Sequence, residues 1–378
     1  MKVLHVVPTF YPATYWGGPI WSTKAICDGI AARNDLELRV LTSDAAGPAI
    51  GVRVTPASLP YPVHYARRWA GHCIAPGLLA RLPGAIHWAD IVHVTGTYNM
   101  PTLPAFALAR AMGKPLVWSP RGALQATQEW PDAPHQRLKR GFEHLANLLR
   151  PRDAVLHVTA GQEARASIRR LGDMARAVIP NSVDVPHAIP DRRRDGAKCR
   201  LMFLSRLHPK KGLEALFKAM PRLPAHFTLD VYGTGDVSYV QALEMRAKLS
   251  GGRIRLHGHV EGPAKTAAFA GADILVLPSH SENFGIVVAE ALAHAVPVLT
   301  TQNTPWQALD RQGCGRCIDL PRSDLATEIE ALAALDMTEM GQRGRDWMRR
   351  DFSTAAMVEG FDGLYRQMVG QGYQEVIV

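Results

Sequence analysis

The sequence of 378 residues lacks any apolar stretch long enough to cross a membrane. Its longest apolar runs, such as Ile274–Leu277, are far shorter than the roughly 18 residues that a membrane-spanning helix needs. Residues 1–8 have neither the long apolar core nor the small-residue cleavage site of a signal peptide, and their pattern predicts a first β-strand instead. We therefore expect a cytoplasmic protein.

Cysteine is scarce, with five residues scattered along the chain. Only Cys314 and Cys317 have a suggestive spacing. A structural zinc site would need two further ligands at motif spacing, and a redox pair should open a helix after a strand. This pair instead lies between glycines in a predicted strand, so reduced thiols and no metal site are expected.

The common nucleotide-binding fingerprints are also missing. There is no Walker A sequence, which argues against a P-loop nucleotidase. Gly17 and Gly18 follow the first strand but do not extend into Gly-x-Gly-x-x-Gly, which disfavours a nicotinamide dehydrogenase. The chain has no Asp-x-Asp pair either, so divalent-metal chelation by such a pair is not expected.

Positive charge is concentrated in the first half of the chain. The net charge of +9 lies within residues 1–183, where 20 Lys and Arg face 11 Asp and Glu. Residues 184–378 hold 23 of each sign. Much of the excess falls in residues 136–152, which could face nucleic acid, an anionic membrane or a phosphorylated substrate, or could be a solvated helix face.

Short apolar strands alternate with helical stretches along the whole chain, which predicts an α/β fold with parallel sheets covered on both faces. Strands are expected at residues 3–7, 38–42, 52–55, 91–95, 116–118, 155–159 and 177–179, and then at 201–204, 228–232, 254–257, 274–277, 297–300 and 316–318. Two such series predict two doubly wound, Rossmann-like domains, 1–183 and 184–352, facing a central cleft. Residues 353–378 should form a final helix, which could return to the N-terminal domain.

The segment that follows the predicted strand 274–277 is the most informative loop. A helix should begin near Gly285, and its unpaired N–H groups would suit a phosphate. Glu282 and Glu290 flank that position and could accept hydrogen bonds from sugar hydroxyls. An ordinary helix start with surface carboxylates is the alternative.

Two other loops follow strands at the same predicted ligand-binding edges. Arg206 and Lys211 lie after the strand 201–204 and could hold a diphosphate, the first as a fork and the second as a point charge. Gly17 and Gly18 could let the backbone approach a phosphate closely, although a tight turn explains them about as well.

Together these loops resemble glycosyltransferase family 4, retaining transferases of the GT-B fold. The resemblance rests on Glu282-x-Phe284-Gly285-x4-Glu290, which looks like the Glu-x7-Glu motif of that family. It is supported by three further segments, which are 205–212, the glycine pair at 17 and 18, and 180–184.

The resemblance implies roles for each matching position. Arg206 and Lys211 would neutralise the diphosphate of a nucleotide-sugar, with backbone N–H groups supplied by Gly17 or Gly18, and Glu290 would hold the ribose diol. A second group of residues would bind the donor sugar, namely Glu282 and the backbone of Asn283, Phe284 and Gly285.

Four further positions are implied less directly. His259 and Val260 fall where the family brackets the nucleobase, and Asn181 approaches from the interdomain junction. Many relatives have a histidine in the loop after the strand equivalent to 115–118. This chain has Arg121 there, which we expect to take over that role; a structural ion pair is the alternative.

The resemblance implies a retaining hexosyltransferase (EC 2.4) without a cofactor, and the missing Asp-x-Asp pair fits metal-independent catalysis. The sequence does not reveal the base of the donor; we expect a UDP-sugar in preference to a GDP-sugar. The positive first domain favours a lipid-linked saccharide acceptor at the inner face of the plasma membrane, with peripheral binding during capsule or exopolysaccharide assembly. A nucleotide-sugar epimerase or a sugar phosphorylase is an alternative on this scaffold. Nucleic-acid binding is disfavoured because no aromatic residues alternate with the basic ones.

Overall fold

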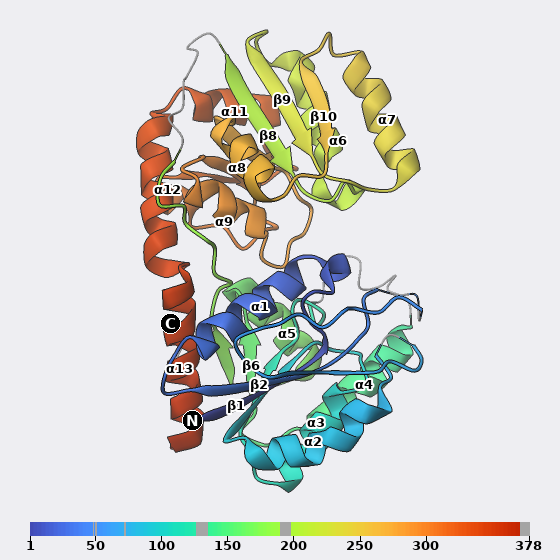
Figure 1. Ribbon diagram of the computed structural model, residues 1–378. Coiled ribbons are helices and arrows are strands. Elements are labelled where there is room, and N and C mark those ends of the chain that lie inside the picture. Colours follow the sequence, from blue (N-terminus) through green and yellow to red (C-terminus); the bar gives the residue numbers. More distant parts are fainter. Residues whose placement is uncertain (48, 50, 72, 126–134, 190–197, 371–378) are drawn as a thin grey trace. The chain divides into compact units, whose positions relative to one another are not determined.

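The computed structural model describes residues 1–47, 49, 51–71, 73–125, 135–189 and 198–370, and it divides into two compact units (Figure 1). Unit 1 contains Met1–Ser182 and the segment from Thr354 onward, and unit 2 contains Val183–Ser353. The C-terminal helix therefore belongs to the same unit as the N-terminus. Among the described residues, none of the helices combines the length and apolar character that crossing a bilayer requires.

Unit 1 is built on seven strands. They are β1 (Lys2–Thr9), β2 (Glu37–Ser43), β3 (Val63–Ala66), β4 (Ile91–Thr95), β5 (Leu116–Ser119), β6 (Val155–Val158) and β7 (Arg176–Val178). Its helical segments are η1 (Thr14–Trp16), α1 (Gly18–Ala31), α2 (Pro76–Trp88), α3 (Thr102–Ala111), α4 (Gln136–Leu149), α5 (Gly161–Leu171) and α13 (Thr354–Gly370).

Unit 2 is built on six strands. They are β8 (Cys199–Leu204), β9 (Phe227–Tyr232), β10 (Ile254–Gly258), β11 (Ile274–Leu277), β12 (Val298–Thr301) and β13 (Gly315–Ile318). Its helical segments are η3 (Pro209–Lys211), α6 (Leu213–Ala219), η4 (Met220–Arg222), α7 (Val237–Lys248), α8 (Gly262–Ala270), α9 (Ile286–Ala293), α10 (Leu309–Gln312), α11 (Leu325–Ala333) and α12 (Met337–Asp351).

Both sheets have the doubly wound order that the alternating pattern predicted. The order is β3-β2-β1-β4-β5-β6-β7 in unit 1 and β10-β9-β8-β11-β12-β13 in unit 2, with parallel pairing throughout. The strand order reverses direction between β1 and β4 in unit 1 and between β8 and β11 in unit 2. At such switch points the loops beyond the carboxyl ends of the strands diverge and leave room for a ligand.

The prediction of a strand at residues 52–55 is wrong. In that stretch only Arg53 pairs, through an isolated antiparallel bridge to Ala45, and Val52 is 53% exposed. The β-branched residues there have no sheet neighbours to pack against, so their strand propensity is overridden. The edge strand of the sheet is instead β3, which the sequence pattern did not reveal.

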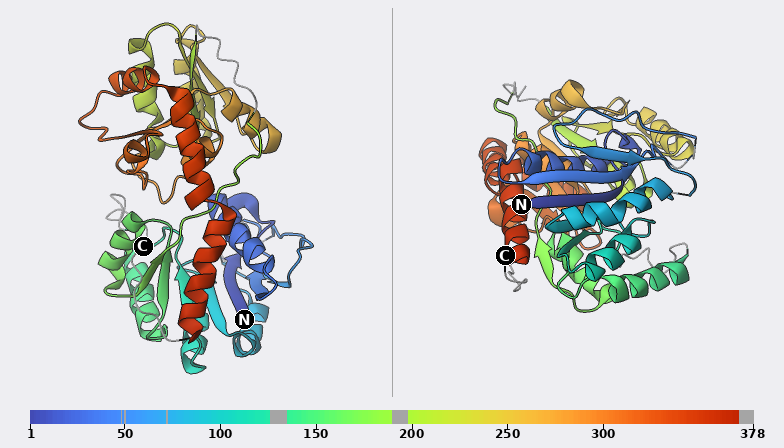
Figure 2. Two further views of the ribbon diagram at one scale, coloured as in Figure 1. Left: turned by 90° about the vertical axis from the view of Figure 1, so that its left-hand side faces the viewer. Right: turned by 60° about the horizontal axis from the view of Figure 1, so that its bottom comes forward.

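The two faces of the unit 1 sheet are covered differently. Helices α2, α3, α4 and α5 pack on one face, whereas α1 and α13 cover the other. Figure 2 shows α13, the last red helix, lying against the unit 1 sheet. The side chains that α13 buries there include Met357, Phe361 and Tyr365.

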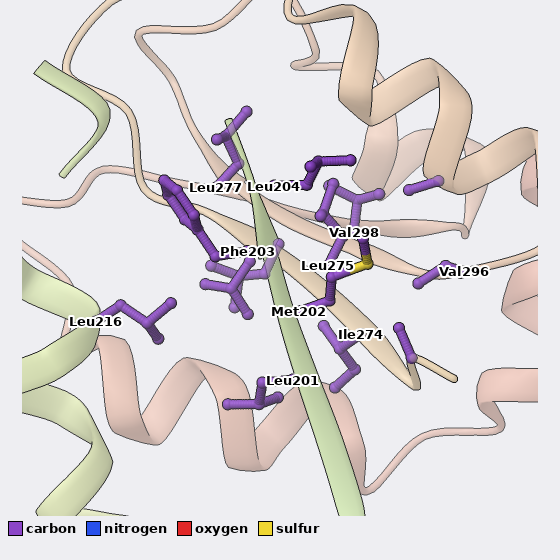
Figure 3. Close-up of a cluster of buried hydrophobic side chains, with 14 of the residues drawn as sticks. Leu201, Met202, Phe203, Leu204, Leu216, Ile274, Leu275, Leu277, Val296 and Val298 are labelled. Atoms are coloured by element: carbon purple, nitrogen blue, oxygen red, sulfur yellow. The ribbon is translucent and has the colours of Figure 1, made fainter. Parts of the chain in front are cut away.

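The core of unit 2 explains why the sequences of its central strands are continuously apolar. All four residues of β11 are buried, since helices cover both faces of that strand. Figure 3 shows Leu201 and Met202 of β8 packed with Leu275 of β11 and Val298 of β12. This packing fixes the carboxyl ends of β8 and β11 side by side and so positions the loops that follow them.

Candidate functional site

The loops after β8 and β11 meet at the switch point of unit 2. Gly212 ends η3 with a φ of 69°, and a Cβ atom added to it would lie 2.0 Å from the carbonyl oxygen of Pro278. The backbone N–H of His280 donates to the carbonyl oxygen of Lys210 at 2.8 Å. Only glycine leaves room for the close approach of Gly212 to the Pro278 carbonyl, so the backbones of the two loops are held firmly against each other.

This contact brings together two of the predicted site residues. The ammonium Nζ of Lys211 lies 2.5 Å from Oε1 of Glu282, and their side chains are only 14% and 10% exposed. The hydroxyl of Ser279 donates to the same carboxylate oxygen at 2.8 Å. A largely buried ammonium is thus held by one carboxylate at the ligand-binding edge, where the oxygens of a bound anion could share it.

The loop that contains Glu282 continues into the start of α9. Gly285 adopts a left-handed conformation with a φ of 71° directly before the helix. The first N–H groups of a helix lack the regular intrahelical partner, and here that of Val288 donates to the carbonyl oxygen of Gly285 at 2.9 Å. Phe284 is buried against Trp306, and its carbonyl oxygen accepts a hydrogen bond from the indole nitrogen of Trp306 at 2.6 Å. The Phe284 side chain therefore anchors this loop, and Asn283 beside it is partly buried.

Glu290 lies on α9, just over one turn beyond Gly285. Its Oε1 atom pairs at 2.6 Å with Nζ of Lys265, which lies on the neighbouring helix α8. Sequence reasoning missed Lys265, since an isolated lysine one turn into a helix carries no signal of its own. The pair fixes the orientation of the carboxylate through one of its oxygens.

The remaining predicted residues of unit 2 are not in contact with this group. Arg206 is exposed, and within the described ranges its side chain has no hydrogen-bond or ion-pair partner. His259 has a 66% exposed side chain 3.5 Å from Glu261, and Val260 packs against the core. The loop that holds His259 and Val260 follows β10, an edge strand of the sheet, and leads into α8.

In unit 1 the glycine pair lies at the N-terminus of α1, after β1 of the switch point. Gly17 has a φ of 65°, which favours glycine, whereas Gly18 is the first helical residue. A Cβ atom at either position would meet no described atom within 4 Å. Packing therefore does not require glycine here, and the backbone is open to an approaching group.

Arg121 and Asn181 form a second contact between predicted residues. Nη1 of Arg121 donates to Oδ1 of Asn181 at 2.9 Å. Arg121 has a φ of 55°, and the next residue, Gly122, donates its N–H to the buried carboxylate of Glu163 at 2.7 Å. This carboxylate also accepts from the N–H and the hydroxyl of Thr159, so the turn carrying Arg121 is held from two sides.

Only part of the hydrogen-bonding capacity of the Arg121 guanidinium is satisfied by the described residues. Its Nε and Nη2 atoms are buried and, among the described residues, have no hydrogen-bond partner. Burial lowers the pKa of Arg121 to about 10, which the Glu163 carboxylate partly opposes. The arginine therefore stays charged at neutral pH, and two of its donors are buried inside unit 1 without a partner among the described residues.

Comparison with known protein families identifies the class to which these two units belong. Residues 17–182 match the family model described as "Glycosyl transferase 4-like domain", and residues 198–334 match that described as "Glycosyl transferases group 1". The first match falls in unit 1 and the second in unit 2. The chain therefore belongs to the family 4 glycosyltransferases, as the Glu-x7-Glu pattern indicated.

Among curated proteins, the chain is similar to the phosphatidyl-myo-inositol mannosyltransferase of Mycobacterium tuberculosis. The two are 30% identical over 156 residues, which is 39% of this chain and 40% of the mannosyltransferase. The chain thus spans about 40% of the length of this curated relative.

Solved structures resemble the chain over almost its whole length. HepE of Anabaena, in complex with UDP, has a TM-score of 0.72 and 19% identity, covering 96% of this chain and 99% of HepE. WaaG, a glycosyltransferase involved in lipopolysaccharide biosynthesis, has a TM-score of 0.66 and 16% identity, covering 98% of this chain and all of WaaG. The likeness to these glycosyltransferases confirms the GT-B fold of two parallel-sheet units.

Proposed function

We propose that this protein transfers a sugar from a nucleotide-diphosphate sugar to a hydroxyl of a saccharide acceptor, with retention of configuration at the anomeric carbon. The observation that carries the proposal is the Lys211–Glu282 pair, held by locked loops at the switch point beside the first turn of α9. Family membership supports the reaction class, and the UDP bound to HepE supports a UDP-sugar donor. Neither supports the nucleic-acid-binding, epimerase or phosphorylase alternatives.

The proposed donor site uses the charges of unit 2. The ammonium of Lys211 and the guanidinium of Arg206 neutralise the diphosphate, together with the N–H groups of Ile286 and Val287 at the start of α9. Glu282 accepts hydrogen bonds from hydroxyls of the donor sugar, and Glu290 accepts those of the ribose. The exposed position of Arg206 gives it the freedom to close on a bound diphosphate.

The proposed chemistry depends chiefly on stabilising the leaving group. The bond from the anomeric carbon to the diphosphate oxygen breaks, while the acceptor oxygen forms a new bond to that carbon on the same face. The acceptor proton passes to a diphosphate oxygen. Preorganised cations lower the barrier because negative charge grows on the diphosphate in the transition state. No metal ion is needed to balance these steps.

We assign the acceptor to unit 1, where the net positive charge lies. Arg121 is the group expected to contact the reacting sugar, with Asn181 hydrogen-bonded beside it. Gly17 and Gly18 leave the N-terminus of α1 accessible to a phosphate oxygen.

The experiment that tests the donor assignment is a thermal-shift screen against nucleotides and nucleotide-sugars. A ligand at about a hundred times its dissociation constant stabilises the folded protein by roughly 2.7 kcal/mol, so UDP or a UDP-sugar should raise the unfolding temperature by several degrees. The variant Glu290→Ala should lose most of this shift because the ribose contact is gone. An exposed variant of the same unit, Glu244→Ala, serves as the control.

A panel in which no nucleotide diphosphate raises the unfolding temperature would contradict the donor site. An unchanged ligand shift in Glu290→Ala would contradict the ribose role alone. Product formation from the donor without an acceptor would instead favour an epimerase, and dependence on inorganic phosphate would favour a phosphorylase.

The acceptor is proposed to be lipid-linked, with the protein bound peripherally to an anionic membrane during assembly of a surface polysaccharide. Helix α4 supports this part of the proposal. Its outward face exposes three leucines, Leu138 (73%), Leu145 (45%) and Leu148 (59%), and the exposed Arg137 and Arg140 lie among them. A helix that presents apolar and basic side chains on one face is typical of binding at a membrane interface.

Membrane binding is expected on vesicles of phosphatidylglycerol mixed with phosphatidylcholine at low salt, and is expected to weaken as salt screens the arginines. Leu145→Glu should reduce the bound fraction in a flotation assay, since it places a negative charge on the apolar face. Leu249→Glu is the matched control, because Leu249 is 88% exposed on unit 2. Equal binding of the two variants, or none by the wild type, would refute the membrane part and leave the transferase proposal standing.

A further inference from the structure

Unit 1 contains a line of buried polar side chains on the sheet face that α13 covers. Four residues supply them, and all are buried, namely His93 of β4, Ser119 of β5, His157 of β6 and Tyr365 of α13. The line starts at the Tyr365 hydroxyl, 2.6 Å from Nδ1 of His93, and Nε2 of His93 lies 2.6 Å from the Ser119 hydroxyl. That hydroxyl lies 2.6 Å from Nδ1 of His157, whose Nε2 is 2.9 Å from the carbonyl oxygen of Ile179.

The direction of every hydrogen bond in this line follows from its last member. A carbonyl oxygen can only accept, so Nε2 of His157 must donate to Ile179, and Nδ1 of the neutral ring must accept. The Ser119 hydroxyl then donates to His157 and accepts from Nε2 of His93. Nδ1 of His93 is left to accept, so Tyr365 donates. One arrangement of protons satisfies all four contacts.

The arrangement requires both imidazoles to be neutral, and their surroundings keep them so. Burial lowers the pKa of His157 to about 3, and the positive charge of Arg121 adds to this effect. Burial also lowers the pKa of His93 well below its usual value, with His5 and His157 as further causes. The titratable groups near the line are thus His5, which stacks on His93 at 4.3 Å, the Cys27 thiol and the Arg121 guanidinium.

Two residues of this line, Ser119 and Ile179, each lie two positions before a proposed site residue. Ser119 ends β5, and Pro120 and then Arg121 follow it. Ile179 follows β7, and Pro180 and then Asn181 follow it. Arg121 and Asn181 are themselves hydrogen-bonded at 2.9 Å. The line therefore ties together the two backbone segments that present this pair, and α13 completes it through Tyr365.

We propose that Tyr365 is a positioning residue. Its hydroxyl donates to Nδ1 of His93 and so completes the His93–Ser119–His157 line. This line holds the ends of β5 and β7 in the position that pairs Arg121 with Asn181 at the proposed acceptor site. The catalytic part of this inference rests on the proposed function. The orientation part does not, since it concerns the substrate-free protein alone.

The variant Tyr365→Phe tests the inference because it removes only the hydroxyl and keeps the ring. In the substrate-free protein, the ¹⁵N resonance of His93 Nδ1 should shift because that nitrogen loses its donor, while the ring keeps its proton on Nε2, and the Arg121 Nε resonance should also shift. Turnover is expected to fall roughly 10- to 100-fold, the size of effect that a small misplacement of a reacting group causes. The thermal shift given by UDP should stay unchanged, since Tyr365 does not act on the donor residues of unit 2.

Phe361→Leu is the matched control. Phe361 lies one turn before Tyr365 on α13 and contacts the rings of His93 and His157 without a hydrogen bond. The Phe361→Leu variant should lower the unfolding temperature while leaving the hydrogen bond at His93 Nδ1, and turnover, near those of the wild type. Tyr365→Phe overturns the inference if it behaves in the same way, with lower stability but unchanged resonances. If the wild type transfers no sugar at all, the proposed function fails, and the resonances alone still decide the orientation role.

Discussion

Replacing Lys211 with alanine is expected to lower turnover by roughly 100- to 1,000-fold, the usual cost of removing one preorganised contact to a developing charge. Arg206→Ala should lower turnover by tens- to hundreds-fold. This loss is smaller because an exposed side chain gives up more conformational entropy when it becomes ordered on the diphosphate, so its net contribution is smaller. Both losses should appear in kcat, because the contacts strengthen as the leaving group gains charge.

The Lys211→Ala variant could also disturb the loop around Glu282, and this structural effect must be separated from the loss of the catalytic contact. Removing the ammonium leaves the largely buried carboxylate of Glu282 with Ser279 as its remaining partner. An unpaired buried charge is strongly destabilising, so part of the loss could come from a disturbed loop. The double variant Lys211→Ala with Glu282→Gln removes that charge as well. Activity that stays low in the double variant assigns the loss to the missing cation.

Lys218→Ala, which removes an exposed lysine of α6, is the control for a simple change of net charge. Lys211→Arg keeps the charge and should recover part of the activity. Near-normal turnover of both the Lys211 and the Arg206 alanine variants, measured with saturating donor, would rule out the proposed stabilisation of the leaving group.

Lowering the pH from 7.5 to 5.5 is expected to reduce the free energy of unfolding of unit 1 by about 4 kcal/mol. Three buried histidines, His5, His93 and His157, have pKa values lowered by burial, to about 3 for His5 and His157. In the unfolded chain they bind protons below about pH 6.5, whereas in the folded protein they stay neutral. The unfolded state thus gains protons and is favoured as the pH falls, and the loss continues until about pH 3.

Glu163 works in the opposite direction, because burial raises its pKa and the folded protein takes up that proton more readily. It is one group against three, so the net effect remains a loss of stability in acid. Amide hydrogen exchange of β4, β5 and β6, corrected for the intrinsic rate at each pH, measures the effect within unit 1.

His5→Gln should remove about a third of the pH effect, since one of the three groups is gone. His144→Gln should leave it unchanged, because His144 is exposed on α4. Equal protection of the β4–β6 amides at pH 7.5 and 5.5 would show that the three imidazoles become protonated in place, and it would contradict the fixed proton arrangement described above.

The fold was largely determined by local sequence patterns. Continuous apolar runs such as Ile274–Leu277 predict buried parallel strands, because only a strand covered on both faces buries every side chain. Order along the chain then predicts which loops share the ligand-binding edge, so Lys211, Glu282 and Gly285 could be selected without coordinates. The sequence patterns did not predict the strand and the helix between residues 53 and 89, because β3 is short and α2 contains Pro83.

Contacts between distant residues were decided by the tertiary structure alone. Lys211 and Glu282 are 71 residues apart, and His93 and Tyr365 are 272 apart. A sequence pattern records which face of an element is apolar, because burial acts on each residue separately. It does not record which charged or polar groups meet, because a hydrogen bond depends on a distance that only the packed chain sets. For this reason the pairing of Lys265 with Glu290, and the placement of the C-terminal helix over the histidines of unit 1, became visible only in the folded protein.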